Sequence, residues 1–353
     1  MMLCKQAIVL ICGLLSVIII VIVCFSDTFI NNFYTSVVTN FSVRTFKTLS
    51  VETLSFRVQS PGCNYVGFTT NKRKLNRLGN YMFYYAGVLY VSWRTGRRPC
   101  IWKSRGFAHR HLDEVFDLDI EYIDQSKLRC PLHVFNQRGI FTYDKRVESL
   151  ISVSENKSLL IHGAFQSWRY TYSIATQLRL KLRFRREIME FAVDFLHMNV
   201  PAGWNTHTFV RVGVHVRRGD FLEAWPRKYG FVVADEQYLQ RAMNYFVERY
   251  QRVQFIVASD DMPWCQKHIK PVMLNKTDIN ITFSVNHNAG QDLALLANCD
   301  HTVMTTGTYS WWAAFLANGT TVYYSNSARR GSRLAADGHN SDYYHPDWIG
   351  FGG

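Results

Sequence analysis

Two adjacent arginines and an aspartate follow a short apolar stretch in residues 209–221, FVRVGVHVRRGDF. The planar guanidinium of arginine matches the oxygens of a phosphate, so Arg217 and Arg218 could together bind a diphosphate. Asp220 could orient these arginines or accept a proton, and the pattern leaves both roles open. A solvated ion pair on a surface turn is the alternative, but the segments around the motif favour a ligand site.

The eight residues before the arginines alternate in the way that a half-buried strand does. Four valines, from Val210 to Val216, fall on one face, and Arg211, Gly213 and His215 fall on the other. Because glycine has no side chain, the polar face of this predicted strand is open at its centre.

Polar residues also follow two other strand-like segments in the same half of the chain. Residues 255–258 lead into Ser259, Asp260 and Asp261, and residues 301–304 lead into TTGTYS. Ligands of open parallel sheets bind beyond the carboxyl ends of the strands, so the three loops should meet at one crevice. TTGTYS leads into an apolar segment predicted to be a buried helix, whose N-terminus could hold a phosphate. It contributes the candidate residues Thr306, Gly307, Thr308 and Tyr309.

Strands and helices alternate through residues 209–324, which predicts an α/β fold with a parallel sheet and helices on both faces. A further helix, led by an acid, is expected over residues 292–298. In the first half we expect strands at 65–68 and 158–162 and one basic amphipathic helix over 176–198. The pattern of residues 105–146 is mixed and predicts no element.

The segment NRLGN at residues 76–80 precedes a helical pattern that ends near Gly96. We interpret it as a glycine-containing loop that opens a helix, a place suited to a phosphate or a sugar hydroxyl. Asn80 is then a candidate ligand residue. In the alternative interpretation, Gly79 and Asn80 only turn the chain and cap the helix.

The 353-residue chain carries a formal net charge of +13, with 48% hydrophobic and 19% charged residues. This composition indicates a globular protein, and no nucleic-acid-binding motif accompanies the basic charge. We attribute the charge to an anionic substrate and a solvated surface, and expect no nucleic-acid partner. The absence of G-x-G-x-x-G and of a P-loop pattern weighs against an NAD or ATP site. No C-x-x-C or His-rich spacing suggests a metal, and we expect none.

Residues 7–25 carry no charge and are long enough to span a membrane as a helix. Lys5 precedes them, which favours an uncleaved signal-anchor with the N-terminus in the cytosol over a cleaved signal peptide. We therefore divide the chain into a tail at 1–6, this anchor, a stem at 26–60 and a body in two domains. The expected domains are 61–204 and 205–353.

Five N-x-S/T patterns support exposure to the secretory lumen, although each is weak alone. Five of the eight cysteines follow the predicted anchor, so at least one of them is free or pairs between chains. The candidate glycosylation sites are Asn40, Asn156, Asn275, Asn280 and Asn318.

The sequence resembles the galactoside alpha-1,2-fucosyltransferases of glycosyltransferase family 11 over roughly residues 63–324. Tyr81 stands where that family often has glutamine, and residues 329–353 have no match, so the acceptor stays open. The segments that carry the resemblance are HVRRGDF, FIVASDDMPWC and DLALLANCDHTVMTTGTYSWWAAFLANGTTVYY, with NRLGN and GAFQSW as shorter matches.

This resemblance implies a type II Golgi membrane enzyme with a GT-B-like fold of two Rossmann-like domains. The first domain would face the acceptor, and the second would bind GDP-fucose. The enzyme would transfer L-fucose, with inversion and without a metal or other cofactor, to the 2-hydroxyl of a terminal galactose. The expected partners are GDP-fucose, a beta-galactoside-terminated glycan, the membrane and, as an option, a second copy of the chain.

By resemblance, Arg217 and Arg218 would hold the GDP phosphates, and Thr308 would contact one of them. His215 would line the nucleotide site, and Asp292 would contact guanine. A further role falls to Asn80, which would reach the donor from the first domain.

Two alternatives remain at this point. A related fucosyltransferase could act on a protein hydroxyl or another sugar, and a membrane-anchored glycan-binding protein could keep the fold without catalysis. Acceptor profiling separates the first alternative, and donor turnover separates the second.

Overall fold

The computed structural model describes residues 63–352, except for 69–76, 104–109, 125–129, 206–207, 272–277 and 338–339. Within these ranges, no helix has the length and apolar character needed to cross a membrane. The predicted tail, anchor and stem lie outside the described residues, and those predictions are not tested.

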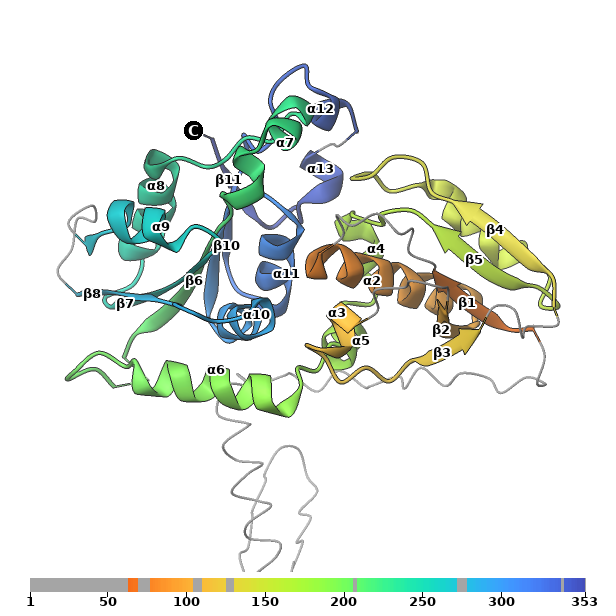
Figure 1. Ribbon diagram of the computed structural model, residues 1–353, viewed down its shortest axis with the longest axis horizontal. Helices are drawn as coiled ribbons and strands as arrows, with labels where there is room; N and C mark the ends of the chain where they lie inside the picture. The colour runs from red at the N-terminus through yellow and green to blue at the C-terminus, as the bar shows by residue number, and fades with distance from the viewer. Residues whose placement is uncertain are drawn as a thin grey trace, which may run out of the picture. The chain divides into compact units, whose positions relative to one another are not determined.

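Five parallel strands form the sheet of the first half, in the order β3-β2-β1-β5-β4 (Figure 1). The strands predicted at 65–68 and 158–162 are confirmed as β1 and β5. Strands β3 and β4 lie in the stretch that predicted no element, since they are edge strands whose residues are mostly half-buried or exposed. The bounds are β1 Tyr65–Phe68, β2 Arg98–Lys103, β3 Glu121–Asp124, β4 Leu132–Asn136 and β5 Ser158–His162.

Six parallel strands form the sheet of the second half, in the order β11-β10-β9-β6-β7-β8. The predicted parallel α/β arrangement is confirmed. Residues 329–353, for which the resemblance gave no match, contribute the edge strand β11. The bounds are β6 Val210–Val216, β7 Val253–Ser259, β8 Ile279–Phe283, β9 His301–Met304, β10 Thr321–Tyr324 and β11 Ile349–Phe351.

Helices cover both faces of this second sheet (Figure 1). The valine face of β6 packs against α8 (Glu236–Val247), which Asp235 caps as its sequence position suggests. The opposite face packs against α10 (Ala289–Ala297) and α11 (Thr308–Ala317). A Cβ atom at Gly213 would lie only 3.0 Å from Leu296 of α10, so the glycine makes room for a helix.

Helix α2 (Leu78–Thr95) includes Gly79 and Asn80 in its first turn, so the predicted loop at 76–80 is wrong there. A Cβ atom at Gly79 would lie 2.8 Å from the backbone nitrogen of Tyr309 in α11. The indole N–H of Trp312 also donates to the Gly79 carbonyl at 2.9 Å. The glycine therefore permits close packing of two helices, a contact that local sequence does not reveal. The helix ends at Gly96, whose φ is 70°, as predicted.

The single helix predicted over 176–198 is in fact two helices, α5 (Ala175–Lys181) and α6 (Arg186–Met198). Between them, Phe184 forms an antiparallel bridge with Phe116, and Arg185 N–H donates to the Val115 carbonyl at 2.9 Å. This pairing replaces the helical hydrogen bonds at the break.

Aromatic side chains join α2 to α11 in the core. The ring of Phe83 lies 4.8 Å from Trp311 and 4.9 Å from Trp312, and all three are buried. The predicted division at residue 205 stays a prediction. The remaining helices are α3 Arg110–Asp113, η2 Lys145–Ser152, α4 Trp168–Tyr172, η3 Gly219–Leu222, α7 Ala224–Tyr229, α9 Met262–His268, α12 Arg333–Asp337 and α13 Asn340–Tyr343.

Candidate donor and acceptor site

A cavity of about 1030 Å³ lies at the carboxyl ends of strands from both sheets. The three loops predicted to meet at one crevice all contribute to its lining. Among the described residues with a predicted ligand role, Arg218 is missing from this lining. The predicted residues that do line it are Asn80, His215, Arg217, Asp220, Asp260, Asp292, Thr306, Gly307, Thr308 and Tyr309.

Arg217 is held in place by two carboxylates. Its guanidinium lies 2.5 Å from Asp220 Oδ1 and 3.0 Å from Asp260 Oδ2, and its side chain is 14% exposed. Its backbone N–H donates to Thr305 Oγ1 at 2.9 Å. The charge therefore faces the cavity in a fixed position, which is what stabilising charge on a bound anion requires.

Asp220 also forms an ion pair with Arg77, at 3.2 Å. Arg77 precedes α2 and Asp220 lies in η3, so this carboxylate links the two halves of the cavity wall. Bracing an arginine was one of the two roles that the sequence left open, and the structure displays that role.

Arg218 has different partners. Its guanidinium stacks on the Trp264 ring at 3.8 Å, and its Nε donates to Asp261 Oδ2 at 3.2 Å. The two neighbouring guanidiniums therefore have different partners, since Arg217 pairs with two carboxylates and Arg218 stacks on Trp264 of α9. The contact of Arg218 with a diphosphate stays a prediction.

Thr308 and Asn80 meet across the cavity floor. Thr308 Oγ1 donates to Asn80 Oδ1 at 3.2 Å, and Gln166 Nε2 donates to the same oxygen at 2.9 Å. Sequence reasoning missed Gln166, although its place in a polar loop after β5 was a usable signal. Its neighbour Phe165 is buried against Gly87, so that aromatic belongs to the core.

The segment TTGTYS is only partly a loop, because α11 begins at Thr308. Gly307 is the N-cap, with a φ of 110° that suits glycine. As in any α-helix, the first N–H groups of α11 point out of its N-terminal end. The Thr306 hydroxyl donates to the Val232 carbonyl at 2.8 Å, and the Tyr309 hydroxyl donates to the Ala289 carbonyl at 2.5 Å. Both hydroxyls therefore form hydrogen bonds within the protein. The N-terminus of α11 is the part of this segment that can bind an anion.

His215 is buried beside the cavity. Its Nδ1 lies 2.5 Å from Ser310 Oγ, and its ring lies 4.7 Å from the Tyr309 ring. Burial, and secondly the charge of Arg217, lower the pKa of His215 to about 3. The imidazole is therefore neutral at physiological pH and acts as a hydrogen-bonding group.

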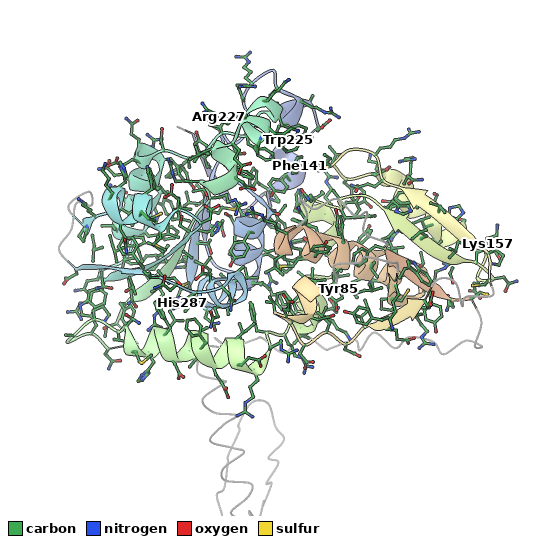
Figure 2. The ribbon with its side chains drawn as sticks, in the orientation of Figure 1. Tyr85, Phe141, Lys157, Trp225, Arg227 and His287 are labelled. Carbon is green, nitrogen blue, oxygen red and sulfur yellow. The ribbon has the colours of Figure 1, made fainter. Side chains whose placement is uncertain are left out.

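Asp292 lies in the first turn of α10 and faces the cavity. The helix begins at Ala289 behind an Asn288 cap, three residues before the predicted start. Burial raises the pKa of Asp292 to about 6, against the hydrogen bond that Ser284 Oγ donates to it at 2.5 Å. His287, labelled in Figure 2, lies 2.6 Å from the same hydroxyl. Sequence reasoning did not identify Ser284 or His287.

The expectation that no metal binds and the five predicted glycosylation sites stay predictions. The described residues contain no group of three or more His, Cys, Asp or Glu that could hold a metal. Asn156 is exposed in a turn, Asn318 ends α11 with a φ of 57°, and Asn280 lies within β8. Asn40 and Asn275 lie outside the described residues.

Residues 36–352 match the sequence profile of glycosyl transferase family 11. The chain is 33% identical over 282 residues to galactoside alpha-(1,2)-fucosyltransferase 1 of Mus musculus, which covers 78% of this chain and 70% of that protein. It is 31% identical over 280 residues to galactoside alpha-(1,2)-fucosyltransferase 2 of Sus scrofa, covering 78% of each. The chain therefore belongs to glycosyl transferase family 11, as the resemblance predicted.

Two solved structures show a low level of structural similarity to the chain. One is a mutant of FUT1 from Arabidopsis thaliana in complex with GDP, at 12% identity and a TM-score of 0.45, covering 79% of this chain and 77% of that one. The other is POFUT1 in complex with GDP-fucose, at 14% identity and a TM-score of 0.47, covering 74% of this chain and 98% of that one. At this level of similarity, neither structure bears on individual residues of the site.

Proposed function

We propose that this protein is a galactoside alpha-1,2-fucosyltransferase. It transfers L-fucose from GDP-fucose to the 2-hydroxyl of a terminal galactose, with inversion at the fucose carbon. The chain belongs to family 11. The observation that carries the proposal is that Arg217, held in a fixed position, lines the same cavity as the N-terminus of α11. The finer description, a GT-B-like fold of two Rossmann-like domains, is part of this proposal.

The chemistry follows from the charge that develops on the leaving GDP. Arg217 is already oriented by Asp220 and Asp260, so it needs no rearrangement to meet the diphosphate. The N–H groups at the start of α11, next to Thr308, add a second stabilising dipole. Asp220 acts here as the brace of Arg217.

Asp292 supplies the remaining donor contact in this proposal. An ionised carboxylate can accept hydrogen bonds from both N–H groups on the edge of guanine, which adenine does not offer. Its pKa of about 6 leaves it mostly ionised at neutral pH. His215 completes the nucleotide wall as a neutral group.

We also propose a type II Golgi membrane protein with a lumenal catalytic body, on the basis of the uncharged residues 7–25. Full-length protein expressed in cells should be protected from protease added outside sealed Golgi vesicles. Cleavage of the body without detergent would overturn this orientation.

The direct test is GDP release from GDP-fucose by the full chain, with and without lactose or N-acetyllactosamine. We expect release to rise with the acceptor and linkage analysis to give fucose on the 2-position of galactose. Another linkage would favour a related transferase, and a glycan-binding protein that never releases GDP would favour the non-catalytic alternative.

A further inference from the structure

Four stacked aromatic rings line one wall of the cavity. The Phe221 and Phe231 rings lie 4.5 Å apart with 19° between their planes. Phe231 is followed by Tyr229 at 5.8 Å, and Tyr229 by Trp225 at 5.4 Å and 16°. The inner end of this aromatic row meets the donor machinery, because the Arg217 guanidinium lies 5.2 Å from the Phe221 ring.

The outer end of the row is open to solvent. Trp225, labelled in Figure 2, belongs to α7. It is 61% exposed and still lines the cavity. Tryptophan presents a large aromatic surface, and such a surface beside the polar groups of a cavity is typical of a ligand-binding site. The Trp225 ring therefore forms a flat apolar surface at the rim of a polar site.

Residues 328–337, near the C-terminus, hold this surface in place. The Tyr229 hydroxyl donates to Asp337 Oδ2 at 2.5 Å, and Arg333 lies 5.8 Å from the Tyr229 ring. Phe231 forms an antiparallel bridge with Ala328. Because Tyr229 is fixed, Trp225 has a rigid ring to stack on before any ligand binds, which lowers the entropic cost of binding.

We infer that Trp225 is the surface on which the sugar ring of the acceptor stacks, an inference that rests on the proposed function. A beta-galactoside carries the C–H bonds of carbons 3, 4 and 5 on one face, which makes that face apolar. Stacking of this face on Trp225 leaves the equatorial 2-hydroxyl at the edge of the ring, where the aromatic surface does not cover it. Two further rings separate Trp225 from Phe221 and Arg217, so Trp225 serves the acceptor and not the diphosphate.

Trp225→Ala in the full chain tests this inference. We expect the KM for lactose to rise about tenfold, as for truncation of an aromatic anchor that is covered by its bound partner. The KM for GDP-fucose and the slow GDP release without acceptor should stay unchanged. Trp225→Phe should restore most of the acceptor affinity, because it keeps an aromatic face.

Trp93→Ala is the matched control, since Trp93 is 39% exposed and is not among the residues that line the cavity. An unchanged lactose KM in Trp225→Ala, or the same rise in Trp93→Ala, would overturn the inference. So would a rise in the KM for GDP-fucose alone.

Lactose binding in the presence of GDP, measured by saturation-transfer NMR, separates this inference from the proposed function. If the wild type binds lactose without turnover and Trp225→Ala does not bind, the surface is supported and the transferase proposal fails. Binding that survives in Trp225→Ala overturns the surface alone. If the wild type neither binds lactose nor releases GDP, both are wrong.

A second, independent observation concerns Cys63 and Cys130. The five cysteines in the described residues are all free; Cys100, Cys265 and Cys299 are buried, whereas these two are half-buried. The neighbouring Cys130 raises the pKa of the Cys63 thiol. Cys63 precedes β1 by two residues, and Cys130 precedes β4 by two residues.

Strand β5 lies between β1 and β4 in the sheet, so Ser158, its first residue, lies between the starts of the two neighbouring strands. The Ser158 hydroxyl at that point lies 3.4 Å from Cys130 Sγ and accepts the Tyr65 N–H at 3.3 Å. The Ser158 hydroxyl therefore contacts both Tyr65, two residues after Cys63, and Cys130 itself.

We propose that Cys63 and Cys130 form a disulfide in the oxidising secretory lumen. The two thiols lose two protons and two electrons as the S–S bond forms. The electrons reduce a disulfide oxidant, such as a thiol–disulfide oxidoreductase or glutathione disulfide, to two thiols through a mixed disulfide. The three buried cysteines stay reduced.

Peptide mass spectrometry of the full chain, alkylated without reduction, tests this disulfide. Protein from secretory-pathway expression should give one cross-linked pair that contains Cys63 and Cys130 and separates on reduction. The same pair should form when the purified protein is equilibrated with glutathione and its disulfide. Alkylation of both thiols in both samples, or pairing with another cysteine, would overturn the proposal.

Discussion

The two walls of the cavity differ in how their side chains are held. On the donor wall, Arg217 is paired with Asp220 and Asp260 and is only 14% exposed. On the acceptor wall, Trp225 is 61% exposed and has rings for neighbours. A leaving diphosphate needs fixed charge in a partly dry site, whereas a neutral sugar needs an apolar surface that it can reach from solvent.

The largest effect should come from the donor wall. Arg217→Ala removes the fixed charge at the diphosphate, and we expect kcat/KM to fall by about a hundredfold or more. Steady-state GDP release measures this fall, and circular dichroism checks that the variant is folded. Arg217→Lys should recover only part of the activity, because an ammonium lacks the planar fork. A folded Arg217→Ala variant with near wild-type activity would contradict the donor wall.

Asp292→Asn should have the next largest effect, an increase of about tenfold in the KM for GDP-fucose, because an amide cannot accept both guanine N–H groups. The pKa of about 6 also predicts a pH profile for the wild type. The carboxylate is ionised above this pH and takes up a proton as pH falls through it, so donor affinity should fall on the acid side. The amide of the variant takes up no proton in this range, so the variant should lose this dependence. Equal acid profiles in the two proteins would exclude the guanine role.

Arg218→Ala should reduce activity less than Arg217→Ala, by about tenfold or less. In the structure Arg218 contacts Asp261 and Trp264, so its loss acts on the donor wall mainly through the support it gives to the loop. The ratio of the two kcat/KM values measures the difference. Equal losses would mean that Arg218 turns to the diphosphate when the donor binds.

The smallest expected effect is that of chelation. Since Arg217 and the N-terminus of α11 supply the stabilisation in the proposed mechanism, EDTA should leave GDP release unchanged. Loss of activity in EDTA, with recovery on adding Mg²⁺ or Mn²⁺, would show that the donor wall needs a cation as well.

Local sequence predicted the second half of the fold well. Strands β6, β7 and β9 were found because their alternating or continuous apolar runs end at clear polar segments. Edge strands β3, β4 and β11 were missed, since partly exposed strands lack such a pattern. The break between α5 and α6 was also missed, because Phe184 pairs with the distant Phe116.

The candidate site divides in the same way. The arginine and threonine motifs follow strands directly, so their place at the cavity could be predicted. Gln166 and His287 reach the cavity only because segments that are distant in the chain pack together. No spacing in the sequence carries that information.

By itself, the sequence determined the family, the parallel α/β architecture of the second half and the residues that follow its strands. Periodicity and short motifs are local properties, and they can be recognised without knowing how the elements pack. Only the tertiary structure decided that Gly79 lies inside a helix, because its reason is the backbone of α11. It also decided that Arg217 and Arg218 contact different residues, since Arg218 stacks on Trp264 and Arg217 pairs with Asp220 and Asp260. Contacts between residues far apart in the chain depend on how whole elements pack, and this packing sets the chemistry of each wall.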